Sequence, residues 1–173
     1  MCSICGKETR EDSPSVVFWC PDCNIPILHE HSSRSVQCPL CGTSADYLCA
    51  DLRPVFPEER LLYEVIRNKP LEYVESSVWA DGSKYYINGS PDSISIKEYE
   101  SLDPDAVIDC LNKYKEQNDS TAFDRTIELF TEANRDHLRN IYEEAAEFVR
   151  AAAAHFPEEN LVVSFSGGKD STV

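Results

Sequence analysis

The sequence predicts an α+β fold for the amino-terminal part of the chain and the start of an α/β domain after it. Three observations support this. Seven of the eight cysteines lie in the first 52 residues, a helical pattern and a hairpin signal share residues 53–118, and an apolar run leads into a glycine-rich loop. We therefore expect a zinc-binding ribbon module over residues 1–52, a small helix and β-hairpin region over 53–118, and the start of an α/β domain over 119–173.

The first module has many turn residues and few apolar runs, so we expect it to depend on bound metal for its stability. Six of its cysteines form three Cys-x-x-Cys pairs, and each such pair supplies two ligands to a tetrahedral zinc ion. Cys20 with Cys23, and Cys38 with Cys41, have the form Cys-Pro-x-Cys followed by Asn or Gly, which suits a tight turn. We call these pairs the first and second knuckle and predict that they bind one zinc ion together. An iron–sulfur cluster is disfavoured, because its cysteines are usually more closely spaced.

The third pair, Cys2 and Cys5, needs two more ligands to close a second zinc site. His29 and His31 lie two residues apart between the knuckles, so an extended segment would point both imidazoles to one face. Cys2 and Cys5 would then bind one zinc ion together with His29 and His31, and the two knuckles would bind another. This alternation along the chain gives a cross-braced module with two zinc ions. Two alternatives stay open: Cys2 and Cys5 pair with the first knuckle, or both histidines are exposed and bind nothing. Cys49 is a reserve ligand if a histidine fails.

The middle region begins with a predicted helix. Pro57 stands at its first position, two glutamates follow in the first turn, and Pro70 marks its end. Asp81-Gly82 is a hairpin signal between two apolar runs, and residues 94–96 alternate as a half-buried strand does. Asp103 before a proline predicts the capped start of a further helix.

Charge limits the partners of this chain. With 16 basic against 31 acidic residues the formal net charge is -15, which repels phosphate backbones at long range. No basic patch is visible, so we interpret Trp79, Tyr85 and Tyr86 as the core of the hairpin rather than as a platform for bases. Cys49 and Cys110 are interpreted as small buried apolar side chains.

The expected cell location rests on three observations from the sequence. No apolar run approaches the roughly 20 residues that a membrane helix needs. The amino terminus lacks the charged and apolar regions of a signal peptide, and the cysteine pairs favour metal over disulfides. We therefore expect a cytoplasmic protein without a membrane partner.

The last region predicts a helix, a strand and an anion-binding loop. An apolar stripe at helical spacing covers residues 126–155, with a break expected near Asp136. Leu161–Phe165 is an apolar run typical of a buried parallel strand. The loop follows directly, and the carboxyl end of such a strand is where α/β proteins bind ligands. Its residues are Ser166, Gly167, Gly168, Lys169, Asp170 and Ser171.

The residue types of this loop suit a phosphate group. Adjacent Gly167 and Gly168 let backbone N–H groups approach an anion closely, and a helix starting after the loop would add its positive end. Lys169 adds a positive charge, and the two serines add hydroxyl donors. Asp170 either caps N–H groups of the loop or holds a Mg²⁺ ion that bridges phosphates. The spacing differs from that of a Walker A loop.

Phe165–Val173 resembles the opening motif of the PAPS-reductase-like branch of the ATP-pyrophosphatase (PP-loop, adenine nucleotide α-hydrolase-like) family. Residues 18–24, 38–42 and 53–62 are similar to the zinc-ribbon extension that precedes the catalytic domain in some members of that family. The resemblance implies a doubly wound parallel sheet, whose loop holds the pyrophosphate of ATP or the phosphosulfate end of an adenylyl sulfate. The family's catalytic domain continues far beyond this loop. We therefore expect the chain to be an amino-terminal fragment without turnover of its own.

The function implied by the resemblance is binding of an adenine nucleotide, for ATP-dependent adenylation and sulfur transfer or for reduction of adenylyl sulfate. No catalytic residue is assigned. The zinc module would recruit a protein or nucleic-acid substrate. The alternative is a zinc-stabilised protein-interaction adaptor whose loop binds nucleotide without catalysis.

Overall fold

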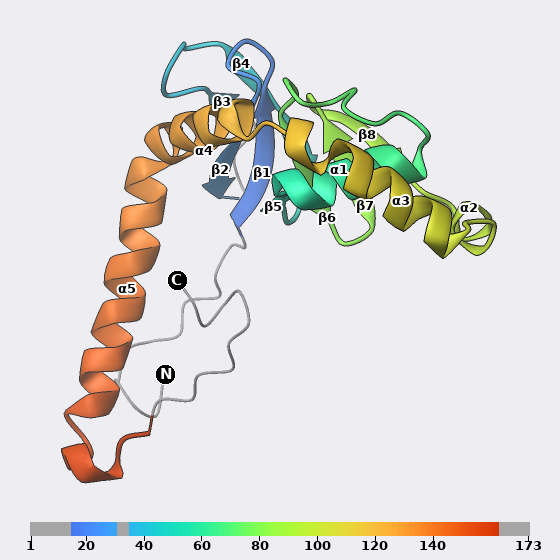
Figure 1. Cartoon of the computed structure of the whole chain (residues 1–173). Helices are drawn as coiled ribbons and strands as arrows, with labels where there is room; N and C mark the ends of the chain where they lie inside the picture. Colours follow the sequence, from blue (N-terminus) through green and yellow to red (C-terminus); the bar gives the residue numbers. More distant parts are fainter. Residues whose placement is uncertain (1–14, 31–34, 163–173) are drawn as a thin grey trace. The chain divides into compact units, whose positions relative to one another are not determined.

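Figure 1 shows the computed structural model of the chain, which describes residues 15–30 and 35–162. The chain divides into two compact units. One is Ser13–His137, and the other combines Met1–Asp12 with Leu138–Val173. Every strand of the described residues, and both knuckles, belong to the unit Ser13–His137.

The first sheet is antiparallel, with its strands in the order β2-β1-β4-β3. The strands are β1 Ser15–Cys20, β2 Ile25–Glu30, β3 Val36–Gln37 and β4 Ser44–Cys49. β1 lies between two partners and is buried from Val16 to Cys20, which explains its continuous apolar sequence. The first knuckle connects β1 to β2 and the second connects β3 to β4, so the ends of strands position all four cysteines.

The second sheet is also antiparallel, with its strands in the order β5-β6-β7-β8. The strands are β5 Arg53–Pro54, β6 Val78–Asp81, β7 Lys84–Ile87 and β8 Ser90–Ser93. The hairpin predicted at Asp81-Gly82 is confirmed, because Asp81 pairs with Lys84 across a two-residue turn. Gly82 has φ +56° at the first turn position, a conformation that glycine adopts without strain.

The strand predicted at residues 94–96 is wrong. β8 lies earlier, and Ile96 instead begins the short helix α2, Ile96–Glu100. Ser95 and Glu98 explain the difference, because they form a capping box: the Ser95 hydroxyl accepts from the Glu98 N–H, and the Glu98 carboxylate accepts from the Ser95 N–H. β8 accommodates Pro91 because it is an edge strand, where a missing N–H leaves no ladder bond unmade.

The remaining helices agree closely with the sequence pattern. They are α1 Pro57–Ile66, α3 Pro104–Tyr114, the 3₁₀ turn η1 Lys115–Gln117, α4 Thr121–Ala133, α5 Arg135–Ala153 and the 3₁₀ turn η2 Glu158–Asn160. Pro57 starts α1 as predicted, and the Asp103 carboxylate caps α3 by accepting from the N–H of Asp105. α1 ends before Pro70, where Asn68 adopts a left-handed φ of +56°. The helical stripe begins earlier than residue 126, and its break lies at Asn134.

Asn134 explains why the helix breaks there. Its side chain is 3% exposed, and its Oδ1 accepts from the Leu28 N–H at 2.6 Å. Its Nδ2 donates to the Pro26 carbonyl at 3.0 Å and to the Phe130 carbonyl at 2.8 Å. One amide side chain therefore satisfies the outer edge of β2 and the carboxyl end of α4 together.

The core of this unit joins the two sheets. One cluster lies on one face of the first sheet and includes Val16, Phe18, Cys20, Ile25, Ile27, Val36, Cys38 and Ala45, with Ala133 of α4. A second cluster contains Val17, Trp19 and Cys49 of the first sheet, and Trp79 and Tyr86 of the second, with Ile127 and Phe130 of α4 packed against it. Trp79 and Tyr86 are both 2% exposed, as expected for a hairpin core. The segment boundaries predicted at residues 52 and 118 stay predictions.

The turn between β7 and β8 packs directly against the first sheet. Gly89 has φ +80°, and a Cβ on it would lie 2.5 Å from Nε1 of Trp19. Beside it, the Asn88 Oδ1 accepts from the Asn24 side chain at 2.8 Å and from the Ser77 N–H at 3.0 Å. Asn24 ends the first knuckle, so this knuckle is tied to the second sheet.

A buried ion pair organises the loop after α1. Arg60 and Glu64 are 2% and 0% exposed, and Arg60 Nε lies 3.6 Å from Glu64 Oε1. The Glu64 carboxylate accepts from the N–H groups of Leu71 and Tyr73, both at 2.8 Å. Arg60 also donates to the Asn118 side chain at 2.7 Å, which fixes the segment before α4. The two charges thereby hold irregular backbone that no strand or helix satisfies.

The doubly wound sheet expected after residue 160 is not tested. Leu161 and Val162 are described outside any strand, and the rest of the predicted strand lies outside the described residues. Across residues 15–30 and 35–162, no helix has both the length and the apolar character that crossing a membrane requires.

Candidate metal centre

The first knuckle is shaped by its backbone. β1 ends at Cys20 and β2 starts at Ile25, and the turn closes when the Asn24 N–H donates to the Cys20 carbonyl at 2.9 Å. Asn24 has φ +58°, which asparagine tolerates better than most residues. The Cys23 N–H donates to the Cys20 sulfur at 3.3 Å, so the backbone already directs a donor toward a negative thiolate.

The second knuckle repeats this geometry. The Gly42 N–H donates to the Cys38 carbonyl at 2.9 Å, and Gly42 has φ +77°. The Cys38 N–H donates to the Thr43 carbonyl at 2.8 Å, and the Thr43 hydroxyl is hydrogen-bonded to the Asp22 carboxylate of the first knuckle. The Asn or Gly after each cysteine pair is thus the residue that closes the turn, as the sequence pattern predicted.

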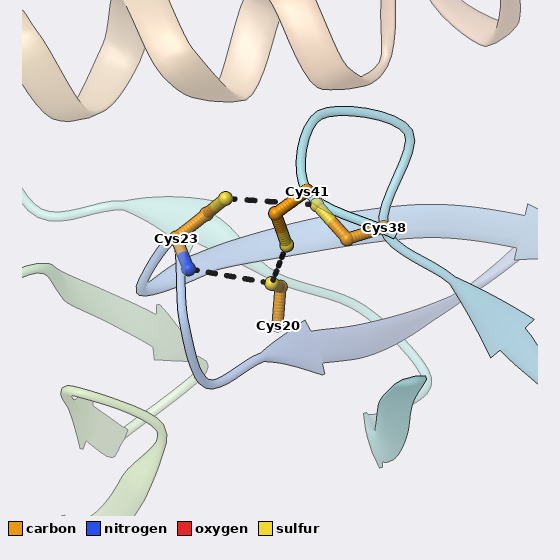
Figure 2. Close-up of side chains that lie close together, drawn as sticks. All are labelled: Cys20, Cys23, Cys38 and Cys41. Atoms are coloured by element: carbon orange, nitrogen blue, oxygen red, sulfur yellow. Dashed lines mark hydrogen bonds between the residues drawn. The ribbon is translucent and has the colours of Figure 1, made fainter. Parts of the chain in front are cut away.

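The four cysteine sulfurs meet in one place, as Figure 2 shows. All four lie within 4.8 Å of one another. Across the knuckles, the Cys20 and Cys41 sulfurs are 3.5 Å apart, and those of Cys23 and Cys38 are 3.8 Å apart. A tetrahedron with zinc–sulfur bonds of about 2.3 Å has sulfur–sulfur edges of about 3.8 Å. The sulfurs therefore have the number, element and spacing that one tetrahedral zinc ion requires, and they leave no room for a larger cluster.

The cluster lies at the end of a hydrophobic core. Cys20 and Cys38 belong to the same apolar cluster as Phe18 and Ile27, and Cys23 packs against it with Leu129 of α4. Without a metal ion, burial there raises the pKa of Cys20 and of Cys23. A bound cation would replace the thiol protons and compensate the negative charge of the buried thiolates.

Cys41 differs from the other three because it is exposed. Thr43 lowers the pKa of Cys41 to about 6, its side chain contributing most and its backbone next. The lowered pKa favours the thiolate form of Cys41, which is the form that binds a metal ion.

Among the residues that the structure describes, no other predicted ligand joins this cluster. Cys2, Cys5 and His31 lie outside the described residues, so the second zinc site stays a prediction. His29 is exposed on β2, where its ring meets Phe18 edge-on at 6.4 Å between centroids. Cys49 is 6% exposed, and its sulfur donates to the Asp51 carbonyl, as expected of a buried small side chain and not of a ligand in this site.

The predicted phosphate loop, Ser166 to Ser171, also lies outside the described residues. Sequence reasoning missed the groups around the metal centre. Asp22 and Thr43 link the knuckles, and Asn88 ties the first of them to the second sheet. Asn88-Gly89 is a turn sequence, but its contact with Asn24 across the fold is not encoded in it.

Comparisons with protein-family models, with curated proteins and with solved structures found no match for this chain.

Proposed function

We propose that residues 15–49 form a structural zinc centre held by Cys20, Cys23, Cys38 and Cys41. The observation that carries this proposal is the meeting of four sulfurs within 4.8 Å at the ends of strands. Four thiolates complete the tetrahedral shell of zinc and leave no position for water or substrate, which is the pattern of structural sites and not of catalytic ones. Zinc would supply the cross-link between the knuckles that a core of this size cannot supply alone.

The experiment is a metal assay with paired variants. By elemental analysis, protein purified without added metal should hold one zinc ion per chain, or two per chain if Cys2 and Cys5 form the second predicted site. Cys20→Ser and Cys38→Ser should each abolish the zinc of this cluster, whereas Cys110→Ser, which changes a cysteine of α3, should keep it. Full zinc content in Cys20→Ser would refute the proposal.

We further propose that the loop Ser166–Ser171 binds the pyrophosphate of an adenine nucleotide or the phosphosulfate of an adenylyl sulfate. The order of helix, apolar run and glycine loop supports this, together with the family resemblance of the loop. The backbone N–H groups of Gly167 and Gly168 would hold phosphate oxygens, Lys169 would balance their charge, and Asp170 would cap the loop or hold Mg²⁺.

Calorimetry with ATP and with 3′-phosphoadenylyl sulfate, each with Mg²⁺, tests this second proposal. Gly168→Val should abolish binding, because its side chain would occupy the space of a phosphate oxygen. In a chain extended past Val173, pyrophosphate release would indicate a transferase and sulfite release a reductase. Heats that are identical for Gly168→Val and the unchanged chain would contradict a role for the loop.

The alternative is an interaction adaptor. Among its described residues, the ribbon exposes two large apolar side chains, Leu40 at the tip of the second knuckle and Tyr47 on β4, which are 37% and 59% exposed. A zinc-dependent complex with a partner, lost in Tyr47→Ser and formed without nucleotide turnover in the extended chain, would favour the adaptor.

A further inference from the structure

The four cysteines of the proposed zinc centre differ in their access to solvent. Cys20 and Cys38 are 0% and 2% exposed, Cys23 is half-buried, and Cys41 is exposed. Cys41 closes the second knuckle, and its side chain reaches back toward the first, as Figure 2 shows. A dissolved oxidant that approaches the cluster therefore meets the sulfur of Cys41 first.

The sulfur next to that of Cys41 belongs to Cys20, in the first knuckle. The Cys20 sulfur is 3.5 Å from that of Cys41, and it lies in the core at the end of β1. A modified Cys41 therefore has a second sulfur directly beside it. Cys23 and Cys38 form the other cross-knuckle contact, at 3.8 Å.

We propose that Cys41 is an oxidation site, through which a peroxide joins Cys41 to Cys20 and ejects the metal ion. This inference rests on the proposed zinc centre. In the first step the Cys41 thiolate attacks one oxygen of hydrogen peroxide, the O–O bond breaks, and Cys41 becomes a sulfenic acid as hydroxide leaves. In the second step the Cys20 thiolate attacks the Cys41 sulfur, a disulfide forms, and a second hydroxide leaves. Two electrons pass from the two sulfurs to the peroxide.

Loss of these two ligands removes one sulfur from each knuckle. Cys23 and Cys38 remain, and two thiolates hold zinc far more weakly than four do. The change also reaches the second sheet. Cys20 follows Trp19, which packs on Gly89, and the first knuckle ends at Asn24, which is hydrogen-bonded to Asn88. Metal release should therefore alter the junction between the sheets.

The test treats the zinc-loaded chain with one equivalent of hydrogen peroxide. Zinc content is measured first, so that an absent zinc centre is recognised separately from a failed oxidation. Released zinc is followed with a chromophoric chelator, and disulfides are mapped by differential alkylation and mass spectrometry. We expect one zinc released per peroxide consumed, a Cys20–Cys41 disulfide, and rebinding after treatment with dithiothreitol and zinc.

Cys41→His is the decisive variant, because imidazole keeps a zinc ligand and removes the exposed sulfur. We expect it to retain zinc and to release it at least tenfold more slowly than the unchanged chain. Cys23→His is the matched control, which keeps both Cys41 and Cys20 and should release zinc rapidly. Equal release rates in the two variants, or a disulfide that joins Cys41 to any cysteine except Cys20, would overturn the proposal. Should Cys41→His fail to fold, the disulfide map of the unchanged chain decides alone.

Discussion

Replacing Gly89 with alanine tests the contact between the two sheets. The alanine Cβ would lie 2.5 Å from Nε1 of Trp19 and 2.7 Å from its Cδ1 and Cε2, distances that no real carbon contact tolerates. Either the indole ring or the turn must move. Forcing a side chain into a packed site typically costs about 1–3 kcal/mol. Gly89 also has φ +80°, where a residue with a Cβ loses roughly 1–2 kcal/mol more. We therefore expect Gly89→Ala to lower the free energy of unfolding by about 2–5 kcal/mol.

Gly82→Ala supplies the matched control. Gly82 also has a positive φ, +56°, but a Cβ there would meet nothing within 4 Å. This variant should lose only the strain, roughly 1–2 kcal/mol. The difference between the two variants isolates the clash with Trp19.

Urea unfolding of the zinc-loaded chain, followed by tryptophan fluorescence, measures both variants. The chain has two tryptophans, and both Trp19 and Trp79 lie in the core that joins the sheets. In a Trp19→Leu background, Gly89→Ala should cost no more than Gly82→Ala. The reasoning fails if Gly89→Ala and Gly82→Ala are equally stable in the chain that retains Trp19.

Three further predictions concern other parts of the same unit. Asn134→Ala leaves the N–H of Leu28 and the carbonyl of Pro26 without partners and should lower the free energy of urea unfolding by about 2–5 kcal/mol. The control Asn140→Ala changes an exposed residue and should alter stability by less than about 0.5 kcal/mol. Equal effects of the two variants would count against the role of the Asn134 side chain at the edge of β2. Zinc chelation should remove strand signal from the circular dichroism spectrum. It should also shift tryptophan emission to longer wavelength, because Trp19 precedes the ligand Cys20. A circular dichroism spectrum that is unchanged after complete zinc removal would exclude a structural centre. Hydrogen bonds from Ser95, its backbone N–H before its hydroxyl, lower the pKa of Glu98 below its ordinary 4.5, so the stabilisation by ionised Glu98 is present above pH 4.5 and is lost as the pH falls through the lowered pKa. Carbon NMR titration should show this midpoint rising in Ser95→Ala, which loses the hydroxyl and keeps the backbone N–H, and an unchanged midpoint would exclude the Ser95 hydroxyl as a cause.

The local features of the fold could be predicted because short sequence signals carry them. Pro57, Asp103 and Asp81-Gly82 each act through their own backbone geometry, and the structure places a helix start or a turn at every one. The knuckles were predictable for the same reason, because Cys-Pro-x-Cys with Asn or Gly after it specifies a turn and two ligands. That Cys20, Cys23, Cys38 and Cys41 belong to one cluster followed from the ligand number of zinc.

Features that depend on distant partners could not be predicted. Arg60 and Glu64 have the composition of a solvated helix face, yet both are buried because the loop after α1 needs their hydrogen-bonding groups. Leu62 of α1 is apolar, yet it is 39% exposed. The strand expected at residues 94–96 failed because alternation over three residues is a weaker signal than the capping box of Ser95. For Arg60 and Glu64 the deciding contacts join positions whose proximity the pattern does not encode, whereas the capping box of Ser95 and Glu98 is itself a local sequence signal.

The amide clamp of Asn134 has a consequence for how this chain meets other copies of itself. β2 is an edge strand, and such an edge offers unpaired N–H and carbonyl groups to any strand that approaches it. Here Pro26 has no N–H to offer, and Asn134 occupies both the Pro26 carbonyl and the Leu28 N–H. The side chain of Asn134, between α4 and α5, thus takes the place that a neighbouring strand would fill. Beyond any loss of stability, the Asn134→Ala chain would present an open edge, and self-association through β2 is the behaviour that this closed edge prevents.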